Sequence, residues 1–311
     1  MYSSGVKTSH FLRTKSQIVG FPFLFENFKG ASGRFSLNIF VHWAYTKQAY
    51  IRQETMKSKE EIVRNWLPRY TDTPLKSFGE YVLLTNFTNY VQLFTERFGV
   101  PVNGLDKPMQ TATAENITIL NFGMGSAMAA TAMDLLSAVA PKAVLFLGKC
   151  GGLKKTKVGD LILPIAAIRG EGTSNDYLPP EIPALPSFRL QRAVSSVIKR
   201  HEMDYWTGTV YTSNRRVWEH DEKFKQYLRD IRTMGIDMET ATIFSVGFIN
   251  SIPHGALLLV SDNPMEPEGV KTADSDKKVT QTYVKKHLDI GIDSLKELAN
   301  SGESVKHLIF E

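Results

Sequence analysis

Four short segments decide the fold of this 311-residue chain: NFGMG (Asn121 to Gly125), FLGKCGGL (Phe146 to Leu153), GIDMETAT (Gly235 to Thr242) and LLLVSDNP (Leu257 to Pro264). Each segment joins an apolar, β-like run to a glycine turn or to an acidic residue with apolar neighbours. An α/β enzyme collects polar groups in this way at the carboxyl ends of its strands. The four segments together therefore predict an α/β enzyme with one polar site.

The rest of the core repeats this alternation of apolar runs and amphipathic segments. Strands are predicted at 81–85, 117–123, 143–148, 159–168, 206–213 and 256–262, and helices at 91–98, 126–139, 190–201, 221–233, 238–250 and 280–299. No linker, repeat or low-complexity stretch interrupts the series. The order predicts one α/β domain with a central mixed β-sheet flanked by helices.

The composition is that of an ordinary globular protein, with 42% hydrophobic and 22% charged residues. No apolar run approaches the roughly 20 residues needed to span a bilayer, so no membrane partner is expected. The single Cys150 excludes an intramolecular disulfide and a Cys-cluster metal site, which favours a cytoplasmic location. No metal or cofactor is predicted, because four histidines of the core stand alone without ligand spacing: His201, His220, His254 and His287.

The amino-terminal segment differs from the rest of the chain. Residues 1–55 carry seven Lys or Arg against two Glu, which accounts for the whole net charge of +5, and they hold 11 of the 33 aromatic residues. A nucleic-acid partner is not expected, because the excess charge is not spread over a working face. We predict that 1–55 is an extension outside the fold and that 56–311 is the catalytic domain. Translated upstream sequence is the favoured origin of the extension, and a mitochondrial-type presequence is the alternative. An amphipathic helix, KSKEEIVRNWLPRY, follows Met56.

Two glycine turns are candidates for binding. Gly123 and Gly125 suit a strand-to-helix turn whose backbone approaches a ligand, although a tight turn against a helix is an equal alternative. The loop with Lys149 and Gly151 can present its amide N–H groups to a ligand. Lys149 would need an anion in such a loop, unless its side chain reaches solvent.

Two acidic residues are candidates for catalysis. Glu239 lies between apolar flanks in DMETA, where a carboxylate can accept hydrogen bonds from a ribose diol, or can simply favour a helix N-terminus. Asp262 ends the strand ALLLVSD, where partial burial would raise the pKa of its carboxyl and make it a general acid. An Asp that caps the following turn is the alternative.

With these motifs in order, residues 80–300 resemble the nucleoside phosphorylase/nucleosidase superfamily. Its GxxGG-type loop, GDxxxP strand, MExA helix start and SD strand end recur here in the same sequence. The resemblance is greatest to the short bacterial branch that hydrolyses AMP to adenine and ribose 5-phosphate. It implies that Asp262 protonates the purine at N7, that Glu239 holds the ribose hydroxyls, and that Met238 packs against the sugar. It also implies that Ser261 supports Asp262 and that Trp218 or Val217 lies near the base.

The resemblance also bears on the nucleophile and the 5′-phosphate. Phosphorylases of this superfamily carry an arginine where this chain has Phe146, so we expect water rather than phosphate to attack. An EGTS-like stretch is shared with uridine-cleaving relatives, but these lack the acid that Asp262 supplies. The candidates for the 5′-phosphate site are cationic or hydroxyl side chains, with the adjacent arginines 215 and 216 favoured: Lys149, Arg169, Thr173, Ser174, Arg215 and Arg216.

Other readings remain open from the sequence. A purine nucleoside phosphorylase with an unusual phosphate site would show phosphate-dependent turnover of nucleosides. A module that senses AMP without cleaving it would need Asp262 or Glu239 to be misplaced. The resemblance further implies a homo-oligomer, namely a hexamer built as a trimer of dimers.

Overall fold

A computed structural model describes residues 57–300 of the chain. The predicted extension 1–55 lies outside the described residues. The first described helix is α2 (Lys59–Thr71), which Ser58 and Glu61 start with a reciprocal capping box. Val63 and Leu67 are buried on its inner face, whereas Trp66 is 43% exposed. The amphipathic helix predicted after Met56 is therefore present.

Eight strands form the sheet of the described part. They are β1 (Tyr81–Thr85), β2 (Gln110–Ala114), β3 (Ile117–Asn121), β4 (Ala143–Gly152), β5 (Leu161–Gly170), β6 (Trp206–Ser213), β7 (Gly235–Asp237) and β8 (His254–Asp262). Their order is β2-β3-β1-β4-β7-β6-β5-β8, and β4 also pairs with β8. Five strands, β4, β7, β6, β5 and β8, thus close into a ring, from which β1, β3 and β2 extend. Parallel and antiparallel pairs both occur, so the predicted mixed sheet is confirmed.

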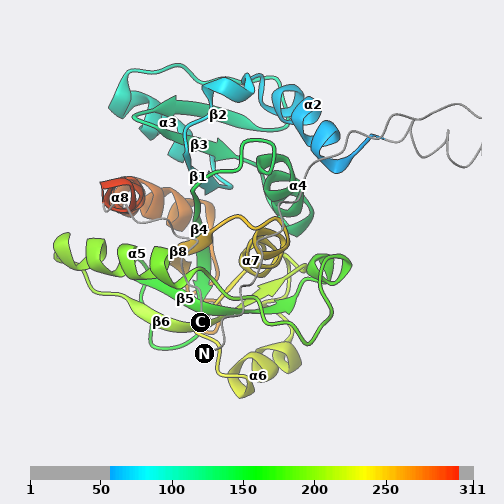
Figure 1. The fold of residues 1–311 in the computed structure, drawn as a ribbon. Coiled ribbons are helices and arrows are strands. Elements are labelled where there is room, and N and C mark those ends of the chain that lie inside the picture. Colours follow the sequence, from blue (N-terminus) through cyan, green and yellow to red (C-terminus); the bar gives the residue numbers. More distant parts are fainter. Residues whose placement is uncertain (1–56, 301–311) are drawn as a thin grey trace, which may run out of the picture. The chain divides into compact units, whose positions relative to one another are not determined.

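Helices cover both faces of this sheet (Figure 1). The α-helices besides α2 are α3 (Thr88–Phe98), α4 (Ser126–Leu136), α5 (Phe188–Arg200), α6 (Glu222–Asp230), α7 (Thr240–Ile249) and α8 (Ala273–Asn300). Two short 3-10 helices are η1 (Leu75–Ser77) and η2 (Thr173–Asp176). Helix α4 packs against α7, while α5 packs against α8. The sheet is therefore enclosed between two helical layers.

The central strands divide their side chains between two hydrophobic cores. On β4, Val144 and Phe146 belong to the core shared with α4 and α7, whereas Leu145 and Leu147 belong to the core shared with α8. This alternation is the two-residue period of a strand with both faces covered. It explains why AVLFLG is apolar at almost every position.

Two strands were not predicted from the sequence. Strand β2 consists of QTATA, whose small and polar residues carry little hydrophobic signal, and it pairs with β3 at the edge of the sheet. Strand β7 has only three residues before the turn into α7. Helix α8 begins at Ala273 rather than at residue 280, because its first two turns are polar.

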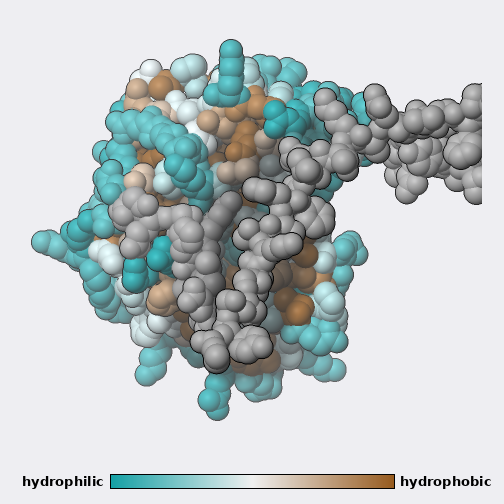
Figure 2. Space-filling model, in the orientation of Figure 1, coloured by the Kyte–Doolittle hydropathy of each residue, from teal (hydrophilic) through white to brown (hydrophobic). Residues whose placement is uncertain are grey.

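The surface in Figure 2 is hydrophilic along most of its outline and carries several separate apolar patches. Large apolar side chains are exposed at Leu105, Phe188, Val217 and Phe248. No helix between residues 57 and 300 combines the length and the apolar character that a bilayer crossing requires.

Candidate active site

A cavity of about 270 Å³ opens where several strands end. Its wall comes from the ends of β4, β7 and β8, from the residues after β1, from the loop after β6 and from the start of α8. Nine residues predicted from the sequence line it: Lys149, Gly151, Arg215, Arg216, Trp218, Met238, Glu239, Ser261 and Asp262. Segments up to 113 positions apart are thus gathered into one site, as expected for the carboxyl ends of strands in an α/β fold.

Glu239 is fixed by main-chain donors. The Gly125 amide donates to its Oε1 at 2.8 Å, and the Met238 amide donates to its Oε2 at 3.3 Å. Burial, together with the neighbouring Asp237 carboxylate, raises the pKa of Glu239 to about 8, although these amide hydrogen bonds oppose the shift. The raised pKa favours the protonated carboxyl in the ligand-free protein, a form that can both donate to and accept from a diol.

Asp237 holds the start of α7 in place. Its Oδ2 accepts from the Thr240 amide at 2.8 Å and from the Glu239 amide at 3.3 Å, while Thr212 Oγ1 donates to Oδ1 at 2.7 Å. Because Asp237 caps the helix, Glu239 is free to face the cavity. Glu239 does occupy the N-cap position of α7, as the alternative from the sequence suggested, but its side chain makes no capping hydrogen bond and the Asp237 carboxylate accepts from the Thr240 amide instead.

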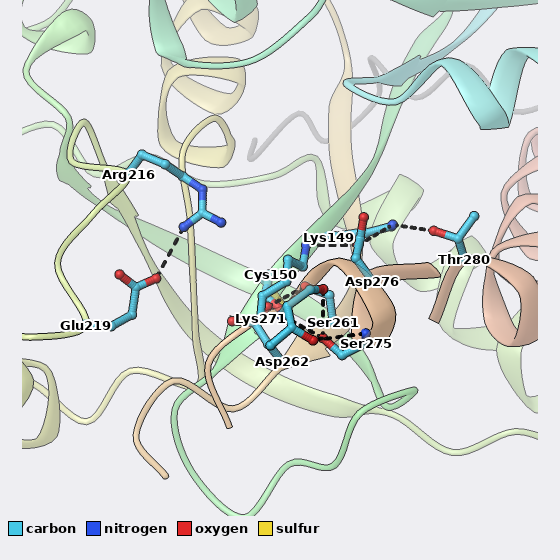
Figure 3. Close-up of polar contacts among 11 residues, drawn as sticks. Lys149, Cys150, Arg216, Glu219, Ser261, Asp262, Lys271, Ser275, Asp276 and Thr280 are labelled. Carbon is cyan, nitrogen blue, oxygen red and sulfur yellow. Dashed lines mark hydrogen bonds and ion pairs between the residues drawn. The ribbon is translucent and has the colours of Figure 1, made fainter. Parts of the chain in front are cut away.

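Asp262 lies at the last position of β8 and is partly buried. Burial raises the pKa of its carboxyl, while the Ser261 hydroxyl and the Lys271 ammonium oppose that rise. Ser261 Oγ lies 2.6 Å from Asp262 Oδ1 and donates to it. The result is a carboxyl oriented by its neighbour at the edge of the cavity (Figure 3). It can retain a proton at a higher pH than an exposed Asp, as a general acid requires.

Lys149 is the buried cation of the site, with a side chain only 2% exposed. Its Nζ donates to Asp276 Oδ1 at 3.0 Å and to Thr280 Oγ1 at 2.9 Å, both on α8, and lies 4.5 Å from the Phe87 ring centroid. Burial lowers the pKa of Lys149, and the Asp276 carboxylate opposes this shift. The alternative that Lys149 points to solvent is wrong.

The two adjacent arginines lie in the loop after β6, and each is paired with an acid. Arg215 contacts Asp221 at 3.1 Å, and Arg216 contacts Glu219 at 3.2 Å. Both side chains are about half exposed. Trp218 is buried between them and the core, with its ring edge-to-face against Phe224. The acids are less exposed than the arginines, and each also accepts from a main-chain amide, so the half-exposed guanidinium groups are the part of each pair that an incoming anion can reach.

Three residues predicted to bind the 5′-phosphate lie away from the cavity. Arg169 uses its guanidinium to hold the loop 174–182, with carbonyl acceptors that include Leu178 and Pro179 at 2.6 Å. Ser174 accepts from Arg169 Nε at 2.9 Å and is fully buried, next to Thr173 in η2. None of the three is among the residues that line the cavity. The geometry gives them a role in shaping the proline-rich loop instead.

The glycines of the first motif act through their backbone. Gly123 and Gly125 have φ angles of 82° and 94°, which favour glycine. They are not part of the cavity wall, but Met124 between them is. Gly125 reaches the site through its amide bond to Glu239.

Sequence reasoning missed several residues of the site. Asp276 comes from the start of α8 and Lys271 from the loop before it, and Glu219 comes from the loop after β6. Asn86, directly after β1, also lines the cavity, with a buried Oδ1 that has no hydrogen-bond partner. No group of His, Cys, Asp and Glu side chains in residues 57–300 is arranged to hold a metal ion.

Comparison with known proteins places this geometry in a family. The model of the Phosphorylase superfamily matches residues 81–296, which include every strand and the whole cavity wall. The chain belongs to the phosphorylase superfamily. The predicted enzyme class and nucleoside phosphorylase-like fold are thereby confirmed.

Within the phosphorylase superfamily, the chain is similar to solved and curated relatives. The crystal structure of AMP nucleosidase from Bacteroides thetaiotaomicron VPI-5482 is 58% identical, with a TM-score of 0.71, and the match covers 79% of this chain and 100% of that one. AMP nucleosidase of Escherichia coli K12 is 29% identical over 76% of this chain and 58% of its own length. The chain thus spans less than two thirds of that curated relative.

More distant relatives are phosphorylases. Guanosine phosphorylase of Halorubrum lacusprofundi is 29% identical over 53% of this chain and 68% of its own length. A uridine phosphorylase structure from Vibrio fischeri ES114 is 21% identical with a TM-score of 0.62, over 72% of this chain and 93% of that one, and it shares the fold. The superfamily therefore contains both kinds of nucleophile, phosphate and water.

Proposed function

We propose that this protein is an AMP nucleosidase, which hydrolyses the N-glycosidic bond of AMP to adenine and ribose 5-phosphate. The observation that carries the proposal is the pairing of Asp262 and Glu239 in one cavity, in a chain 58% identical to an AMP nucleosidase. Release of adenine from AMP is a step of purine salvage. A purine nucleoside phosphorylase is the alternative, because the superfamily includes such enzymes.

The leaving group is the first chemical problem. Adenine departs poorly as an anion, so a proton must reach N7 as the glycosidic bond breaks. Asp262 supplies it, because burial raises the pKa of this carboxyl and Ser261 orients it. General acid catalysis of this kind accelerates a reaction on the order of 10²–10⁴-fold.

The sugar becomes positively charged as the bond lengthens. Glu239 binds the ribose hydroxyls, and the growing charge of the ring favours the ionised form of its carboxyl. Met238, which lines the cavity next to Glu239, packs against the sugar. Trp218 lies against the base. Binding energy that appears only as the charge develops raises the rate rather than the affinity alone.

The 5′-phosphate is bound by Arg215 and Arg216. Both line the cavity, and both guanidinium side chains are about half exposed, so a phosphate that enters the cavity can reach them. A guanidinium offers a planar fork that matches two phosphate oxygens. Arg169, Thr173 and Ser174 are not part of this proposal, because none of them lines the cavity and Arg169 makes its hydrogen bonds to the loop near η2.

The nucleophile is water. Phe146, at the position where phosphorylases of the superfamily carry an arginine, is fully buried and packs against Phe122 with 5.9 Å between ring centroids. It offers no charge for inorganic phosphate. Asn86 lines the cavity wall, and its side chain hydrogen-bonds Glu239, which places it among the polar groups beside the attacking water.

The protein acts as a homo-oligomer in the cytoplasm, with residues 56–311 as the catalytic domain and 1–55 as an extension. Self-association is supported by exposed apolar side chains, Phe188 and Phe248 among them. A cytoplasmic location is supported by the single, buried Cys150. Size-exclusion chromatography with light scattering measures the oligomer, for which a hexamer is expected.

Adenine release tests the function directly. AMP and adenosine are incubated with the enzyme in phosphate-free buffer and again with added phosphate, and the sugar product is identified. Ribose 5-phosphate from AMP without added phosphate, with little turnover of adenosine, is the expected result. Turnover that requires phosphate and yields ribose 1-phosphate from adenosine would overturn the proposal in favour of the phosphorylase.

A further inference from the structure

The environment of Lys149 is unusual for a cation at a site that receives anionic molecules. The side chain is almost fully buried, and its charge is not available to a ligand. Asp276 accepts one of its hydrogen bonds, Thr280 accepts another, and the Phe87 ring lies against it. All three ammonium donors are thus directed at protein groups, two of them on α8.

Asp276 pairs with a second cation, Lys271, as well as with Lys149. Its Oδ1 also lies 3.2 Å from Lys271 Nζ, so one carboxylate bridges two cations at the cavity wall (Figure 3). Burial opposes the ionisation of Asp276, but the two lysines together hold its pKa below the usual value. The carboxylate is therefore charged throughout the neutral range. The Arg216–Glu219 pair is separate from this group in Figure 3.

This arrangement has an electrostatic consequence for small anions. A phosphate dianion can enter a partly buried cavity only where a cation offsets the loss of its hydration. Lys149 would be the natural partner, but the Asp276 carboxylate already holds it and repels a second anion. Displacing Asp276 from Lys149 would leave that partly buried carboxylate with Lys271 as its one remaining cation, which costs free energy as well.

We propose that Asp276 excludes inorganic phosphate from the nucleophile position and so reserves that position for water. The proposal rests on the function proposed above. The water oxygen forms a bond to C1′ while the C1′–N9 bond breaks, and its electron pair leaves with adenine. Asp262 gives its proton to N7, and the water passes one proton to the bulk solvent, from which Asp262 is protonated again. With phosphate as nucleophile, the same bond change on AMP would give ribose 1,5-bisphosphate.

The test uses the full chain and its Asp276→Asn variant, with inorganic phosphate as the probe. Phosphate binding is measured by the shift of Tm, and the products from AMP are identified by ³¹P NMR. In the native protein, phosphate binds only at the Arg215 and Arg216 site, whose shift of Tm is the reference for the variants, and ribose 5-phosphate is the only product. In the variant, phosphate binds at least about tenfold tighter, because a like charge has been removed. It then inhibits adenine release or appears in ribose 1,5-bisphosphate.

Three further variants complete the design. Asp276→Ser also removes the charge, so a folding failure of the Asn variant does not decide the matter. Asp276→Glu keeps the charge and is expected to respond to phosphate as the native protein does. Asp293→Asn removes a carboxylate from the same helix, where it pairs with His201 at 2.8 Å, and is expected to leave phosphate binding unchanged.

Two results would overturn the proposal. One is a folded Asp276→Asn protein that binds phosphate no more tightly than the native protein. The other is tighter binding of AMP with no change toward inorganic phosphate, which would assign Lys149 to the 5′-phosphate. The Tm measurement needs no turnover. Failure of the native protein to release adenine would therefore overturn the proposed function separately from the role of Asp276.

Discussion

The amide of Gly125 donates to Glu239 Oε1 at 2.8 Å, although the two residues are 114 positions apart. A second bond beside it, from Ser126 Oγ to the Met238 carbonyl at 2.6 Å, joins the same two segments. Together they fasten the turn after β3 to the start of α7. The acid proposed to hold the ribose is thus positioned by main-chain atoms, whose geometry the fold itself fixes.

The raised pKa of Glu239 predicts a specific dependence of stability on pH. Because the pKa is about 8 in the folded protein and near 4.5 ordinarily, folding favours the protonated form. The stabilisation that protonated Glu239 gives to the folded state is fully present below pH 4.5 and is lost as the pH rises through about 8. Glu239→Gln cannot ionise. We therefore expect the native protein to lose on the order of a few kcal/mol of unfolding free energy relative to Glu239→Gln over that range.

Chemical denaturation of both proteins across pH measures this difference. Glu219→Gln is the matched control at the same cavity. Burial opposes the ionisation of Glu219, but the main-chain bonds and Arg216 hold its pKa below the usual value. Its contribution is therefore lost as the pH falls, with the opposite sign. A native protein and Glu239→Gln whose stabilities stay parallel from acid to alkaline pH would contradict the prediction.

Removal of the proposed general acid should affect the rate and spare the binding of substrate. Asp262→Asn keeps the shape of the side chain and the contact with Ser261, but it has no proton to give. We expect kcat for AMP to fall on the order of 10²–10⁴-fold with KM nearly unchanged. Steady-state kinetics with adenine detection measure both parameters.

The pH profile of the native enzyme provides a second check on Asp262. Burial raises the pKa of this carboxyl, and its protonated form is the active one, so kcat should fall as the pH rises through that raised pKa. The alkaline fall should disappear from the residual activity of Asp262→Asn. A variant that keeps the native profile at reduced amplitude would assign the titration to another group.

Arg216 should distinguish AMP from adenosine. Its guanidinium lines the cavity and is held only by an exposed pair with Glu219. Arg216→Gln should raise KM for AMP about tenfold or more, since a charge-assisted hydrogen bond is worth about 1.5–3 kcal/mol, and leave adenosine kinetics unchanged. Arg229→Gln, on the surface of α6, is the control. An equal effect on both substrates would exclude Arg216 from phosphate binding.

The sequence predicted those site residues that are marked by their immediate neighbours in the chain. Asp262 follows an apolar strand directly, and Glu239 lies between apolar residues at a helix start, so neighbouring residues mark both. Arg169 could not be told from Arg216 in this way, because its acceptors are carbonyls of residues up to 13 positions later. Asp276 was missed for the same reason: only the packing of α8 brings it to Lys149.

The strands, too, could be predicted only where the local sequence marks them. Strands such as β6 have strong apolar or alternating patterns, and their bounds agree with the prediction. Strand β2 is made of Thr, Ala and Gln, and its position depends on hydrogen bonds to β3 rather than on hydrophobic burial. The closure of β4 against β8 is a property of the whole sheet, with no signal in either strand alone.

Gly125 offers a test of whether its backbone conformation serves catalysis. Its φ of 94° and ψ of 159° lie in a region that is essentially restricted to glycine, so Gly125→Ala should cost about 1–3 kcal/mol although the space around a new Cβ is open. Gly99→Ala is the matched control, with φ of 65° at the end of α3 and equally open space. Both variants should lose stability in denaturation, but only Gly125→Ala should lower kcat for AMP, because its altered backbone withdraws the amide from Glu239. Equal loss of activity in the two variants would show that the bond between Gly125 and Glu239 does not serve the reaction.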